Sequence, residues 1–176
     1  MGDFTLRVKH WQVFLGTMLL MLVGNLTIED STLASATLSA IGYCIFSAWL
    51  ALIGNSLFPF LPRKAEYNLT WFLIDVAVGV VARAAVIILT DERSFQAAGL
   101  PAVALLYIIF AQLHGPWFLA VSLVAIEKQR EPEFGSYFGT LLLFLFWPVG
   151  LWVLQPRLNK VWQDRQAGLP SVEKIA

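Results

Sequence analysis

Five stretches of apolar residues, joined by short polar connections, dominate this sequence. They cover residues 11–28, 33–57, 69–89, 100–126 and 137–154. A helix needs about 17–25 apolar residues to cross a bilayer of ordinary thickness, so each stretch is long enough for one crossing. The connections are too short to hold a soluble domain. The sequence therefore predicts an all-α integral membrane protein, a compact bundle of four to five transmembrane helices in a single domain over residues 1–176.

Composition and charge narrow the class of protein and its partners. Of the 176 residues, 58% are hydrophobic and only 14% are charged, which is more apolar surface than a soluble domain of this length can bury. The formal net charge of zero gives no general attraction to nucleic acid, so we expect the lipid bilayer as the main partner. Cys44 is the one cysteine and lies in an apolar stretch, so we expect no disulfide, no metal and no other cofactor.

The positions of the basic residues predict the orientation of the helices. Connections on the cytoplasmic side retain lysine and arginine. Such residues occur before the first stretch, between the second and third, and after the fourth: Arg7, Lys9, Arg63, Lys64, Lys128 and Arg130. We therefore expect a multi-pass protein of a cell (inner) membrane, of bacterial type, with its N-terminus in the cytoplasm.

The fifth stretch, residues 137–154, has two interpretations. If it crosses the membrane completely, the basic residues of the C-terminal tail lie outside, against the charge rule. If it enters and returns, they lie inside, and Pro148 and Gly150 permit the turn that this requires. The sequence leaves a kinked full crossing and a re-entrant hairpin equally open.

The residues after the fifth stretch predict a short interfacial helix. Leu154, Leu158, Val161 and Trp162 recur on one face, as in helices that lie at a lipid surface. Pro156 suits the first turn of such a helix, where its missing N–H is not needed.

Two ionisable residues, Asp75 and Arg83, lie inside the third stretch. Burial of a charge in hydrocarbon is costly, so neighbouring helices must shelter both. Gly79 and several alanines in the same stretch permit close helix contacts, which predicts that this helix is central. The two charges are about 12 Å apart along a helix axis, too far to pair with each other. Each therefore needs another partner.

The fourth stretch offers those partners. Tyr107 and His114 share one helix face, and an antiparallel arrangement brings His114 close to the depth of Asp75. We predict that Asp75 faces His114, and that Arg83 meets Tyr107 together with Asn25 of the first stretch. Such an Asp–His pair is either a proton relay or a structural hydrogen-bonded cluster.

Gly115 and Pro116 follow His114 directly. Pro116 cannot donate to the carbonyl of Gln112, which leaves a backbone acceptor near the ionisable groups. One interpretation is a broken helix with a binding site at Gln112, as in transporters, and the other is a simple kink.

Glycines and other small residues occur four positions apart at two further places. Gly135 and Gly139 precede the middle of the fifth stretch, and a similar pattern opens the second at Ser35, Ala36, Ser39 and Ala40. Small residues at this spacing allow close helix contacts. We expect these residues to pack inside the bundle, with a dimer face as the alternative.

Motifs for hydrolytic or nucleotide-dependent chemistry are absent from the sequence, which disfavours an enzyme. The leading prediction is a binding or accessory membrane protein, acting with other membrane-protein subunits or as a homo-oligomer. The alternative is a small proton-coupled transporter or channel that uses the cluster of Asp75, Arg83 and His114.

Overall fold

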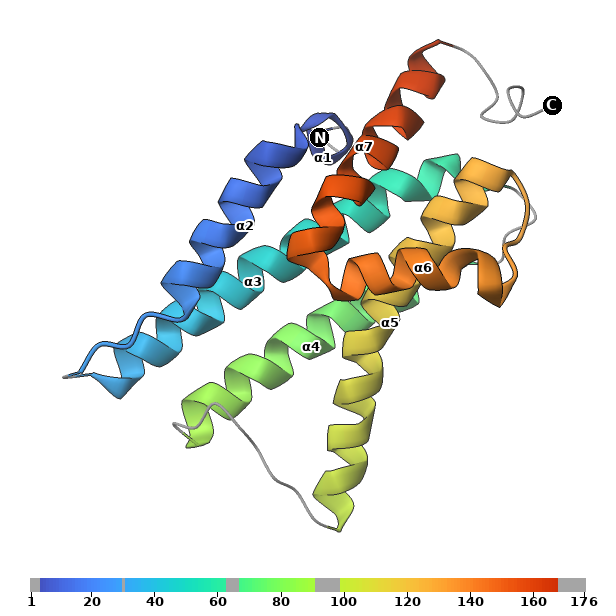
Figure 1. The fold of residues 1–176 in the computed structure, drawn as a ribbon. Helices are drawn as coiled ribbons and strands as arrows, with labels where there is room; N and C mark the ends of the chain where they lie inside the picture. The colour runs from blue at the N-terminus through green and yellow to red at the C-terminus, as the bar shows by residue number, and fades with distance from the viewer. Residues whose placement is uncertain (1–3, 30, 63–66, 91–98, 168–176) are drawn as a thin grey trace.

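The computed structural model describes residues 4–29, 31–62, 67–90 and 99–167. This part of the chain is helical, as the sequence predicts (Figure 1). The elements in chain order are α1 (Phe4–Arg7), α2 (His10–Gly24), α3 (Thr32–Leu57), the 3-10 turn η1 (Phe58–Phe60), α4 (Leu69–Thr90), α5 (Leu100–Lys128), α6 (Phe134–Leu145) and α7 (Trp147–Gln166).

Three of the helical segments are long and apolar enough to cross a membrane. They are Leu33–Phe60, Leu69–Val86 and Pro101–Lys128. The first and fifth apolar stretches form shorter helices, since α2 has 15 residues and α6 has 12. At 1.5 Å per residue α6 is about 18 Å long, well short of a hydrocarbon core of about 30 Å. The helical bundle is thus confirmed, and three of the described helices are long and apolar enough to cross a membrane, while the count of four to five crossings stays a prediction.

Local side-chain chemistry accounts for where the long helices begin and end. Ser31 Oγ accepts from the backbone N–H of Ala34 at 3.2 Å and caps α3. Asn68 Oδ1 accepts from the backbone N–H of Thr70 at 2.9 Å and caps α4 in the same way. Helix α5 ends before Gln129, because this residue takes a left-handed conformation with φ of 50°.

Consecutive helices are neighbours, and α7 returns to the beginning of the chain. It packs against α1 and α2 as well as against α6 (Figure 1). At the opposite end of the molecule, α4 and α5 diverge toward Thr90 and Leu100, as Figure 1 shows. The bundle is therefore closed at the end that holds the N-terminus and open at the other.

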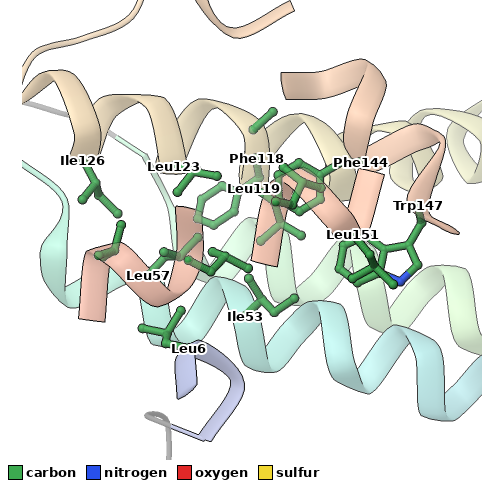
Figure 2. Packing of buried hydrophobic residues seen from close by; sticks show 14 of the residues in the cluster. Leu6, Ile53, Leu57, Phe118, Leu119, Leu123, Ile126, Phe144, Trp147 and Leu151 are labelled. Carbon is green, nitrogen blue, oxygen red and sulfur yellow. The ribbon is translucent and has the colours of Figure 1, made fainter. Parts of the chain in front are cut away.

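The hydrophobic core lies at the closed end. Helices α3, α5 and α7 supply most of it, with Leu6 of α1 beneath them (Figure 2). The fully buried members include Ile53, Leu57, Leu119, Leu123, Leu151, Leu154 and Leu158. The residues of α7 thus complete a core that α3 and α5 alone would leave open.

The fifth apolar stretch is two helices joined at Phe146. Phe146 has φ of −92° and ψ of 52°, outside the helical range, and α7 starts at the next residue. Across the turn Gly150 lies so close to Leu143 that an added Cβ would stand 2.6 Å from the carbonyl carbon of Leu143 and closer still to its oxygen. The two parts of the stretch are therefore separate helices, because the chain folds back at Phe146.

The predicted interfacial helix after residue 154 is also wrong. Helix α7 begins at Trp147 with Pro148 in its first turn, and Pro156 lies inside it. Leu158 is fully buried and Val161 is only 5% exposed, so the apolar face that the sequence assigns to lipid packs into the core instead. The physical reason is that the turn at Phe146 aims this face at α3 and α5.

Polar contacts also hold α7 in place. The Nε2 atom of the buried Gln155 donates to the backbone oxygens of Thr5 at 2.9 Å and Val8 at 3.0 Å, where the short helix α1 ends. These bonds satisfy carbonyls that a helix end leaves without an intrahelical partner.

A second polar link joins α7 to α5 and α6. Arg157 donates through Nε and Nη2 to the two carboxylate oxygens of Glu127, at 2.7 and 2.6 Å. Its Nη1 donates to Thr140 Oγ1 at 3.0 Å. This two-bond geometry is the strongest form of an arginine–carboxylate contact.

The small residues behave differently at the two places. Helices α2 and α3 approach closely at Ser39, whose Cα would stand 3.9 Å from a Cβ added at Gly24. At Gly135 and Gly139 an added Cβ would meet nothing within 4 Å. The prediction of internal packing is wrong for these two glycines, because the turn at Phe146 leaves this face of α6 uncovered by the described part of the chain.

Candidate functional site

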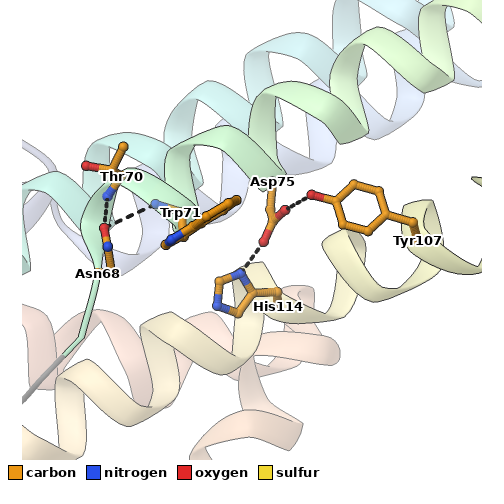
Figure 3. Close-up of polar contacts among 6 residues, drawn as sticks. All are labelled: Asn68, Thr70, Trp71, Asp75, Tyr107 and His114. Carbon is orange, nitrogen blue, oxygen red and sulfur yellow. Dashed lines mark hydrogen bonds and ion pairs between the residues drawn. The ribbon is translucent and has the colours of Figure 1, made fainter.

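Asp75 of α4 is the centre of the polar cluster that the sequence predicts. Its side chain is 4% exposed, yet both of its oxygens have partners. Tyr107 Oη donates to Oδ1 at 2.8 Å, and His114 Nδ1 lies 2.5 Å from Oδ2 (Figure 3). The predicted contact between Asp75 and His114 is therefore present. With Asp75 ionised, its oxygens can only accept, and Nδ1 of His114 is then the donor in this pair.

An aromatic face of α5 surrounds His114. Tyr107, Phe110, His114 and Trp117 follow one another at three- and four-residue steps, which places them on one side of the helix. The imidazole is stacked between Phe110, at 5.7 Å between ring centroids, and Trp117, at 5.4 Å. This packing fixes the ring so that Nδ1 points at Asp75, while the other ring nitrogen points away from it (Figure 3).

A pocket of about 360 Å³ opens beside the carboxylate, between α4 and α5. Besides Asp75 and His114, its lining is mainly aromatic and includes Tyr67, Trp71 and Trp117. This volume lies within the range of small-molecule sites. Burial raises the pKa of Tyr67, and the nearby Glu131 and Tyr137 raise that pKa further, so Tyr67 stays neutral at the edge of the pocket.

The chemistry open to this cluster is proton exchange and the binding of a cation. A carboxylate and an imidazole in contact hold one titratable proton between them, in a setting where charge is costly. The part of the chain that the structure describes has no group of three metal-ligating side chains that could hold a metal ion.

Arg83 does not join this cluster. Its guanidinium lies over the ring of Tyr43 of α3, with 5.5 Å from Cζ to the ring centroid, and its side chain is exposed. The predicted contact of Arg83 with Tyr107 and Asn25 is wrong. Tyr107 turns toward Asp75 instead, and Asn25 caps its own helix by donating to the backbone oxygen of Met21 at 2.7 Å. The prediction assumed that the two antiparallel helices stay side by side along their whole length, whereas α4 and α5 diverge toward Thr90 and Leu100 (Figure 1).

Gln112 also lies apart from Asp75. Its amide packs on Gly79, where an added Cβ would stand 2.5 Å from Gln112 Nε2. Helix α5 runs from Leu100 to Lys128 with Pro116 inside it, so the interpretation as a broken helix is wrong. Gln112 and Arg83 line a separate cavity on the diverging side of α4 and α5.

Sequence reasoning missed the aromatic lining of the Asp75 pocket. Phe110 precedes His114 by four residues and Trp117 follows it by three, and these spacings place them on its face of the helix. That pattern was visible in the sequence. Trp71, one turn before Asp75 on α4, follows from the same rule.

Comparison with known proteins gives no match: no protein-family model, no curated protein and no solved structure is similar to this chain. The geometry around Asp75 is therefore the basis for a functional assignment.

Proposed function

We propose that this chain is a multi-pass membrane protein that binds a small organic cation between α4 and α5 in exchange for a proton. The observation that carries the proposal is the buried carboxylate of Asp75, held by His114 and Tyr107 beside an aromatic pocket. This is the proton-coupled alternative that the sequence predicts, with Arg83 removed from it.

The distribution of basic residues supports membrane insertion with the N-terminus in the cytoplasm. Arg7 of α1 lies over the ring of Trp162 of α7, and Arg165 of α7 lies over the ring of Phe60. The C-terminal helix therefore shares one end of the molecule with the N-terminus. In a cell membrane that end is the cytoplasmic side, since basic residues collect there, and α6 with the start of α7 is a re-entrant hairpin.

The lining of the pocket favours a cation over other ligands. Aromatic rings attract cations through their negative faces, and quaternary ammonium groups are bound in such aromatic sites. Trp71, Trp117 and Tyr67 supply the rings, and Asp75 supplies the countercharge. An anion in the same place would meet a buried carboxylate, which costs free energy.

The exchange with a proton follows from charge balance. In the proposed exchange, the ligand-free site has His114 protonated at both ring nitrogens beside an ionised Asp75, so the pair is neutral. A cation that enters the pocket takes the place of the imidazolium charge, so His114 releases its Nε2 proton and continues to donate from Nδ1 to Asp75. The net charge of the site is the same before and after the cation binds, so the exchange leaves no net charge in an apolar surrounding.

Titration calorimetry with benzyltrimethylammonium on the purified full chain tests the exchange. This cation has no proton to lose, so any released proton comes from the protein. The same titration in phosphate and in Tris separates proton release from binding, because the two buffers differ in heat of protonation. We expect proton release of up to about one per bound cation, because the imidazolium of His114 has one proton to lose while it keeps its bond to Asp75.

Variants make the test specific to this site. We expect Asp75→Asn to weaken binding by at least about tenfold, since the countercharge is lost. His114→Gln is expected to bind without proton release, and His10→Gln, at the other histidine of the chain, to behave as wild type. Binding that is unaffected by Asp75→Asn, or proton release that persists in His114→Gln, contradicts the proposal.

A second candidate is an accessory subunit of a larger membrane complex. The face of α6 with Gly135 and Gly139 has nothing within 4 Å of either added Cβ, and Phe134 and Phe138 beside it are exposed. Small residues flanked by large ones are typical of helix–helix interfaces in membranes. Purification from the native membrane distinguishes the two functions, because a stoichiometric companion protein that is lost on Gly139→Leu supports the subunit.

A further inference from the structure

A second cavity of about 500 Å³ lies between α3, α4 and α5, away from the Asp75 pocket. Among the described residues of its lining, Arg83 and Gln112 have side chains with N–H donors, and Tyr43 adds its ring and hydroxyl. The other lining residues are apolar or lack a side chain: Gly79, Ala82, Val86, Pro101, Ala104, Leu105 and Ile108. The cavity therefore combines one cationic side chain with a mainly apolar lining.

Arg83 has no acidic counterpart among the described residues that line this cavity. Neither ion pair of the described part of the chain includes Arg83, and its guanidinium lies over the ring of Tyr43. An arginine in an apolar helix is costly unless an anion, water or a headgroup neutralises it. Arg83 lies about 10 Å before the end of α4 at Thr90, within the apolar part of this helix.

The shape of the cavity indicates what kind of anion fits. It runs along α5 from Pro101 at the helix start to Gln112, about 16 Å along the axis. Apart from Tyr43 its described walls are mainly aliphatic, and the Arg83 guanidinium and the Gln112 amide are the N–H donors that its described lining contains. Guanidinium groups bind carboxylates and phosphates through two parallel bonds. A ligand with an oxyanion head and an acyl tail satisfies both features.

We propose that this cavity binds an acyl-chain amphiphile, with its carboxylate or phosphate on Arg83 and Gln112 and its tail along α5. The floor of the site is Gly79, where the lack of a side chain lets the Gln112 amide approach α4. This site is independent of cation binding at Asp75, so the two proposals stand or fall separately.

Native mass spectrometry of the full chain in a neutral detergent tests the site. The probes are laurate, dodecanol as its uncharged analogue, and phosphatidylglycerol, with acetate and inorganic phosphate as head groups alone. We expect laurate to bind at least about tenfold more tightly than dodecanol, because the oxyanion contacts Arg83. Tight binding of phosphatidylglycerol as well identifies a membrane lipid as the source, and binding of laurate alone identifies a free fatty acid.

Three variants locate the binding. Arg83→Gln is expected to remove the preference for laurate over dodecanol, and Ala104→Phe, which fills the cavity, to weaken binding of both. Arg165→Gln is the matched control, since Arg165 also lies exposed over an aromatic ring, that of Phe60. The proposal is overturned if Arg83→Gln retains the preference, or if acetate binds as tightly as laurate. Because Ala104→Phe keeps Arg83, the test remains decisive if Arg83→Gln does not fold.

Discussion

The turn between α6 and α7 makes a sharp prediction for Gly150. An alanine there would place Cβ 2.6 Å from the carbonyl carbon and 3.0 Å from the Cα of Leu143, with the carbonyl oxygen nearer still. These are backbone atoms, so they cannot rotate away as a flexible side chain would. The turn at Phe146 must open to accept even one methyl group.

The cost of Gly150→Ala follows from two opposing effects. Overpacking costs about 1–3 kcal/mol, and a clash with backbone belongs at the upper end of this range. Replacing a helical glycine with alanine stabilises the helix by about 1 kcal/mol, because alanine has the higher helix propensity. We therefore expect a net loss of about 2 kcal/mol in the free energy of unfolding.

Gly139→Ala in α6 is the matched control. Nothing lies within 4 Å of an added Cβ there, so the helix propensity acts alone and the variant gains up to about 1 kcal/mol. Unfolding by sodium dodecyl sulfate in mixed micelles, followed by far-UV circular dichroism, measures both free energies. Opposite signs for the two variants support the close turn. If Gly150→Ala is as stable as Gly139→Ala, the hairpin at Phe146 does not exist as described.

Three further substitutions test other contacts. Tyr107→Phe removes a donor to the buried Asp75 and is expected to cost about 1.5–3 kcal/mol of unfolding free energy; the loss should shrink when Asp75 is already Asn, and an equal loss in both backgrounds contradicts the contact. For Arg157 and Glu127, a double-mutant cycle with Gln at each position is expected to give a coupling of about 1 kcal/mol, because both side chains are partly exposed, and salt should reduce it. Gln155→Leu leaves two backbone carbonyls at the end of α1 without their donor, so we expect a loss of about 1–3 kcal/mol and faster hydrogen exchange at residues 5–8; unchanged exchange there refutes this role.

The contact between Asp75 and His114 was within reach of the sequence. The rise of 1.5 Å per residue sets the depth of a side chain along its helix, and short connections make successive helices antiparallel. Two residues at the same depth on adjacent helices can then meet. The same reasoning failed for Arg83 and Tyr107, because depth alone does not say which way a helix tilts or which partner a long side chain prefers.

The burial of the C-terminal helix α7 shows a related limit of prediction from sequence. Its apolar face, with Leu154, Leu158 and Val161, is plain in the sequence, yet a lipid surface and a protein core require the same pattern. The turn at Phe146 and the contacts of Gln155 with α1 decide between them. These contacts join residues about 150 positions apart, which local patterns do not reveal.

The sequence alone determines where the helices lie along the chain, how apolar they are and how far along its helix Asp75 lies. These properties depend only on the geometry of a single helix. The partner of Tyr107, the isolation of Arg83 in its own cavity and the burial of α7 depend on how helices cross. Crossing angles come from the packing of all neighbouring side chains at once, so they exist only in the assembled fold.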